Sequence, residues 1–173
     1  MTYSPRQKLS PHFTHGEVAK SSTADRLNID NVPSDEVLEN AKALAENVLE
    51  PIRKHFGIPF SPQSWYRGED LERVICWKSF EKWCARKGLS VSDDSWDAYF
   101  ARKSHPNGEA ADIEFVGVAN DDLFEWIRDN LEYDQLIREF PKKDDPRSGW
   151  VHVSWKRDGK NRKQHFTIGY ING

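Results

Sequence analysis

The sequence predicts an α+β fold, with a small antiparallel sheet and helices packed on one side of it. Apolar side chains recur at helical spacing in the first half of the chain, most clearly over residues 35–56. In the second half, apolar and polar side chains alternate as in strands, for example over residues 110–115. Helices come first and strands last, which is typical of an α+β domain.

The first helices have recognisable ends. A capping box over residues 14–17 predicts a short helix at about 15–20, and the polar segment 21–33 is rich in turn-forming residues. Ser34 is a good N-cap for a longer helix at about 35–56. One buried stripe of this helix is expected to contain Leu38, Ala41, Ala45, Val48 and Ile52.

The middle of the chain predicts a short strand followed by more helix. The strand is expected at about 60–67 and leads into a turn at Gly68. Residues 69–100 carry a helical pattern that Gly88 interrupts. One face of this pattern contains Val74, Trp77, Phe80, Trp83 and Cys84.

The last third alternates between strands and one helix. A strand at 110–115 precedes a helix at about 121–131, for which Asn120 is the cap. Three more strands are expected at about 134–140, 149–156 and 163–170. The Asp-Gly pair at 158–159 is a hairpin signal, so the last strand is predicted to pair antiparallel with its predecessor.

Length and charge exclude several classes of protein. The 173 residues suit a single domain, 1–173, expected to be a monomer. The net charge of −3 argues against a nucleic-acid-binding protein, which would carry a basic excess. No apolar run approaches the roughly 20 residues of a membrane span, and no secretory signal is recognisable, so we expect no membrane insertion and synthesis in a cytoplasm.

Two of the six histidines lie in informative positions. His105 precedes Asp112, which is expected to share a strand face with the small Ala110. His152 is expected in the middle of a strand, on the same face as Trp150. Two imidazoles and one carboxylate suit a catalytic zinc ion that keeps a fourth position open. A single histidine on a strand is more often structural, so spacing alone leaves both interpretations open.

Two segments resemble a known family. SHPNGEAADIEF, residues 104–115, resembles the His-x-x-Gly-x-Ala-x-Asp signature of the zinc D-alanyl-D-alanine carboxypeptidase family. That family includes the L-alanyl-D-glutamate peptidases of phage endolysins and shares its fold with the hedgehog signalling domain. The stretch GWVHVSW resembles the family's second metal-binding strand. The resemblance implies that His105, Asp112 and His152 bind Zn²⁺.

The resemblance also implies a substrate-binding surface. SWYR resembles the family's Ser-x-Tyr-Arg stretch, which implies that Arg67 holds a carboxylate or carbonyl of the substrate; the ordinary alternative is a structural ion pair. Trp65, Ser104 and Trp150 flank these motifs and are expected to bind substrate. The segment between the Arg67 and His105 motifs is longer than the short link usual in the family, because it contains a helical insertion at about 76–100. This insertion is either a lid or a helical pair packed onto the rest of the domain.

The general base of the family is missing. Many members have Glu three residues before the last histidine, where this chain has Gly149. Glu139 is the best replacement, because its strand should run beside that of His152, and Glu114 is a weaker candidate. Alternatively, Glu139 is an edge-strand charge paired with Arg138 or Lys142, and the domain binds zinc without hydrolysing a substrate.

The resemblance implies a zinc-dependent peptidase that hydrolyses a stem-peptide bond of bacterial peptidoglycan. We expect an endopeptidase that cuts the internal L-Ala–D-Glu bond, in preference to a carboxypeptidase that removes the terminal D-Ala. Such a protein would be made in a host cytoplasm and act at the cell wall after release, or be carried by the virion. The alternative is a non-catalytic zinc-binding or virion structural domain on the same scaffold.

Overall fold

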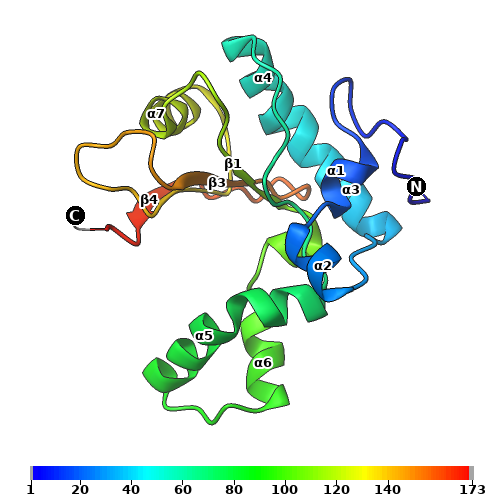
Figure 1. Ribbon diagram of the computed structural model, residues 1–173, viewed down its shortest axis with the longest axis vertical. Helices are drawn as coiled ribbons and strands as arrows, with labels where there is room; N and C mark the ends of the chain where they lie inside the picture. The colour runs from blue at the N-terminus through cyan, green and yellow to red at the C-terminus, as the bar shows by residue number, and fades with distance from the viewer. Residues whose placement is uncertain (1, 172–173) are drawn as a thin grey trace.

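A four-stranded sheet lies at the centre of the computed structural model, which describes residues 2–171. Its order is β1-β3-β2-β4, and α7 (Asn120–Asn130) packs against it, so the predicted α+β class is confirmed (Figure 1). The strands are β1 (Ala110–Ile113), β2 (Gln135–Glu139), β3 (Trp150–Ser154) and β4 (Gln164–Ile168).

β3 pairs antiparallel with β1 on one edge and with β2 on the other. This register places Asp112 of β1 and Ile137 of β2 on either side of His152. Residues directly opposite each other in a sheet point to the same face. One face of the sheet therefore contains Asp112, Gln135, Ile137, Glu139, Trp150 and His152, and we call it the metal face.

The predicted antiparallel pairing of the last strand is wrong. β4 pairs in parallel with β2, which makes the sheet mixed. β1 and β2 already occupy both edges of β3, so β4 cannot pair with its predecessor and instead joins the outer edge of β2. The side chain of Arg162, just before β4, donates to both carboxylate oxygens of Asp134, just before β2, at 2.7 and 2.6 Å, which fixes the two strand starts side by side.

The helices of the first half follow the predictions, except for one additional helix and one change of winding. α1 (His15–Ala19) begins with the expected capping box, but a helix that was not predicted, α2 (Ser22–Leu27), follows it. The Ser21 hydroxyl accepts from Ala24 N at 3.2 Å and caps α2, so a Ser that was interpreted as a turn former begins a helix.

The long predicted helix is continuous but changes its winding. It consists of α3 (Asp35–Leu44), the π-helical turn η1 (Ala45–Leu49) and α4 (Glu50–Phe56). Pro51 lies just after η1 and has no N–H to donate, so regular α-helical bonding cannot pass through this point.

The strand predicted at 60–67 does not form. A single β-bridge joins Ser64 to Asp112, where Asp112 N donates to Ser64 O at 2.8 Å. Pro59 and Pro62 lack the N–H groups that a longer ladder would need.

The predicted helical insertion forms a hairpin of α5 (Glu69–Lys87) and α6 (Asp93–Phe100). In Figure 1 the hairpin extends away from the sheet, on the side opposite α7. It has a small core of its own, separate from the main core, formed by Cys76, Phe80, Cys84, Trp96 and Tyr99. Among the described residues, no helix combines the length and apolar character that a bilayer crossing requires.

Gly149 permits the close approach of β3 to β2. Its φ of +62° lies in the left-handed region, and a Cβ atom at this position would meet Glu139 O at 1.9 Å. Neither the conformation nor the space suits a residue with a side chain. The family's glutamate would not fit at this position of the backbone.

We expect Gly149→Ala to lower the free energy of unfolding by about 3 kcal/mol or more, from backbone strain plus overlap. Gly159→Ala is the matched control, because Gly159 also has a positive φ, +78°, but a Cβ there meets nothing within 4 Å. The control should lose about 1–2 kcal/mol. Urea unfolding measures the free energy of unfolding of both variants. Equal losses of stability would show that the close approach of Gly149 to Glu139 O adds nothing to the cost of a side chain.

Candidate metal centre

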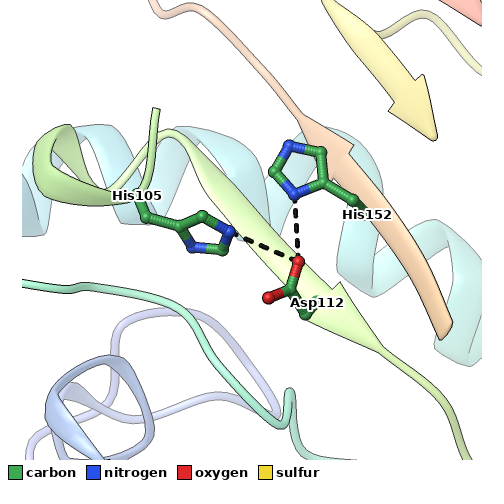
Figure 2. Close-up of side chains that lie close together, drawn as sticks. All are labelled: His105, Asp112 and His152. Carbon is green, nitrogen blue, oxygen red and sulfur yellow. Dashed lines mark hydrogen bonds and ion pairs between the residues drawn. The ribbon is translucent and has the colours of Figure 1, made fainter. Parts of the chain in front are cut away.

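Three buried side chains from three separate elements converge on one point. His105 comes from the 3₁₀ turn η2 (His105–Asn107), Asp112 from β1 and His152 from β3 (Figure 2). Each offers one ligand atom, and these atoms all lie within 4.8 Å of one another. Asp112 Oδ1 lies 2.9 Å from His152 Nδ1 and 3.3 Å from His105 Nε2. The sequence-predicted ligand set is therefore assembled.

Neighbouring backbone holds His105 in a defined tautomer. His105 Nδ1 lies 2.6 Å from the carbonyl oxygen of Trp65. A carbonyl only accepts, so Nδ1 carries the proton and donates. Burial lowers the pKa of His105, and the charge of Asp112 opposes this shift. Nε2 lies toward the Asp112 carboxylate, where it can offer a lone pair to a bound cation when the ring is neutral.

The donor set fits a transition-metal site. Two imidazole nitrogens and one carboxylate oxygen form a set that zinc commonly accepts, and metal-binding histidines typically donate their other N–H to a carbonyl, as His105 does. Gly108 makes the turn possible: its φ is +71°, and a Cβ there would lie 2.6 Å from Val37 O.

Asp112 remains ionised in spite of its burial. Burial raises its pKa, but the charges and hydrogen bonds of His105 and His152 outweigh this and hold the pKa well below its usual range. Arg67 adds a further partner, since its Nη2 lies 2.5 Å from Asp112 Oδ2. A buried carboxylate needs such partners, because an unpaired one would be very costly.

Arg67 is already engaged within the chain. Besides Asp112, its guanidinium donates to Ser64 Oγ at 2.8 Å and lies 3.6 Å from Glu72 Oε2. The ion-pair alternative considered for Arg67 is therefore present in this structure. Glu72 is 1% exposed, and its other carboxylate oxygen lies 3.6 Å from Lys103 Nζ.

Sequence reasoning missed Glu72. An acidic residue in the first turn of a helix is ordinarily explained by the helix dipole, so the sequence offered no signal for a buried role. Its carboxylate connects the hairpin to Arg67, and through Arg67 to the candidate metal ligand Asp112.

Glu139 lies beside the cluster on the metal face. Its Oε1 is 4.0 Å from His152 Nδ1, and its side chain is 16% exposed. Burial raises the pKa of this carboxyl, and the charge of Asp112 adds to the effect, whereas His152 opposes it. Arg138 does not pair with the Glu139 carboxylate but donates to Asp121 Oδ1 at 2.8 Å. The alternative base, Glu114, is exposed beyond the end of β1.

The three other predicted substrate-binding residues lie in different environments. The Trp65 side chain, expected to bind substrate, is 0% exposed and donates from Nε1 to Gly108 O at 3.2 Å, so the indole is part of the core. Trp150 is half-buried on the metal face opposite Glu139. Ser104 is half-buried next to His105 and lines a cavity.

No protein-family model matches the chain, and neither a curated protein nor a solved structure matches it significantly. The functional conclusion therefore depends on the chemistry of the site itself.

We expect the purified protein to bind close to one zinc ion per chain and His152→Ala to bind it at least about 100-fold more weakly, because a ligand is lost rather than an outer partner. His165→Ala is the control, since His165 lies on β4 next to Leu136, on the opposite face of the sheet. Elemental analysis and calorimetric titration measure both. Full zinc content in the His152 variant would refute this ligand set.

Proposed function

We propose that the chain is a zinc-dependent peptidase that hydrolyses a stem-peptide bond of bacterial peptidoglycan. The observation that carries the proposal is the buried cluster of His105, Asp112 and His152 with the Glu139 carboxylate beside it on the same sheet face. The resemblance of the two motifs to the zinc D-alanyl-D-alanine carboxypeptidase family supplies the substrate class.

Zinc is the proposed metal, held by His105 Nε2, Asp112 Oδ1 and His152 Nδ1. When bound, it would lower the pKa of a water molecule and polarise the scissile carbonyl group. The site offers three protein donors, as catalytic zinc sites do, whereas structural zinc sites commonly use four.

Glu139 is the proposed general base. It would accept a proton from the attacking water and deliver it to the leaving amine nitrogen as the peptide bond breaks. A raised pKa suits this role, because a carboxylate with a higher proton affinity is a better base near neutral pH.

Arg67 is proposed to act in two ways. Its pairing with Asp112 Oδ2 orients the carboxylate so that Oδ1 points to the two histidines. The Arg67 side chain is also 15% exposed, and its second proposed role is to contact a substrate carboxylate or carbonyl, as the resemblance implies.

Cleavage of an internal bond is favoured over removal of a terminal residue. The cluster lies near the middle of β2 and β3, with Gln135 at one end of β2 and Glu139 and Trp150 at the other. A peptide bound along this surface would extend on both sides of the metal centre. The proposed bond is therefore L-Ala–D-Glu, cut at the cell wall after release from the host cytoplasm or by a virion-carried protein.

Incubation with isolated peptidoglycan tests the activity. With zinc, we expect soluble peptides with a new D-Glu amino terminus, identified by mass spectrometry, and a chelator should abolish them. Release of free D-Ala alone would show a carboxypeptidase. If no chelator-sensitive product appears, the enzyme proposal fails and the non-catalytic binding or structural domain replaces it.

Glu139→Gln tests the base. This variant should keep its zinc but lose about 10²–10⁴-fold in kcat, because the amide cannot accept the proton. The matched control is Glu114→Gln, which makes the same chemical change at the exposed end of β1 and should retain activity. Normal turnover in the Glu139 variant would remove this assignment.

A further inference from the structure

A polar cavity next to the metal centre has no role in the mechanism above. Its volume is about 530 Å³, and it lies where the hairpin, the segment before His105 and the start of β2 meet. Six charged residues line it, four cationic and two acidic: Arg102, Lys103, Lys156, Arg162, Glu109 and Asp134. Cationic groups therefore outnumber carboxylates in its wall.

Two of the cations are available to a ligand. Arg162 is bonded to Asp134, and Lys103 lies 3.6 Å from Glu72 in the hairpin. Within residues 2–171, neither Arg102 nor Lys156 has a carboxylate oxygen within 4.0 Å. The carboxylate of Glu109 is close enough to Lys156 for the two charges to interact, so it offsets part of the excess.

Trp83 adds an unused hydrogen-bond donor. It lines the same cavity from α5, and its Nε1 is buried without a hydrogen-bond partner in the described part of the chain. An indole N–H can only donate, and buried donors in proteins are normally paired. The Arg102 guanidinium lies 5.9 Å from the centroid of the Trp83 ring, so this donor and the cations Arg102 and Lys156 are grouped where a ligand with an anionic acceptor would fit.

The cavity is positioned to take one end of a substrate. It includes Ser104, the neighbour of the ligand His105, and Gln135, which lies two residues before Ile137 on the metal face. Glu139 and Trp150 lie at the opposite end of the same strand pair. A peptide bound over the metal centre along β2 would extend into the cavity at one end only.

We infer that this cavity binds a free carboxylate of the peptide on the carboxyl side of the cleaved bond. In the stem peptide, which the proposed function supplies, the group is the α-carboxylate of D-Glu. Arg102 and Lys156 would pair with it, and the Trp83 indole would donate to it. The helical insertion thereby provides part of the substrate site.

The experiment compares two synthetic stem peptides that differ only in this group, one with the carboxylate and one with the carboxamide. We expect the zinc-loaded wild-type protein to cleave the acid with a kcat/KM about tenfold higher or more, mainly through KM. In the double variant Arg102→Gln/Lys156→Gln this preference should approach unity. Arg157→Gln is the control, because it removes the neighbouring charge, which faces Glu39 outside the cavity, and should keep the preference.

A binding measurement separates this inference from the proposed function. The Trp83 Nε1–H signal in a ¹H–¹⁵N spectrum, assigned by its loss in Trp83→Phe, should shift with the acid product peptide and not with the amide. If both peptides are cleaved equally and the signal does not move, the cavity inference is overturned while the peptidase stands. If neither is cleaved but the acid alone shifts the signal, the peptidase fails while the anion site stands.

Discussion

The carboxylate of Asp112 is the interaction on which the site depends, because three separate groups converge on it. Oδ1 meets the imidazoles of His105 and His152, and Oδ2 pairs with the guanidinium of Arg67. An isolated carboxylate could not be buried here, so each partner offsets part of its desolvation. The register of β1 with β3 places Asp112 opposite His152, and a slip of one residue would turn one of them to the other face.

A chain of charges continues from this carboxylate into the helical hairpin. Arg67 joins Asp112 to Glu72, and Glu72 in turn faces Lys103, which lies two residues before the ligand His105. Because the hairpin has its own small core, these contacts link it to the centre of the molecule through ion pairs as well as through the chain. The orientation of the hairpin and the environment of the metal ligands are therefore coupled.

Glu139 and Gly149 lie side by side in the sheet. Gly149 packs directly on the carbonyl of Glu139, so the two positions are neighbours in space although they lie on different strands. The backbone at Gly149 leaves no room for a side chain, and Glu139 offers a carboxylate from the adjacent strand instead. The carboxylate on the metal face therefore comes from β2 and not from the start of β3.

The sequence by itself determined the α+β class and most element positions and singled out the three residues that come together as a candidate metal centre, because periodicity, caps and motif spacing are local properties. It did not determine the parallel pairing of β4, since strand partners depend on which sheet edges are free. It also predicted that Trp65 binds substrate, although the fold buries the indole and the backbone carbonyl of Trp65 orients His105. The burial of Glu72 and the cationic cavity were decided by tertiary structure alone, because they arise where segments distant in sequence meet.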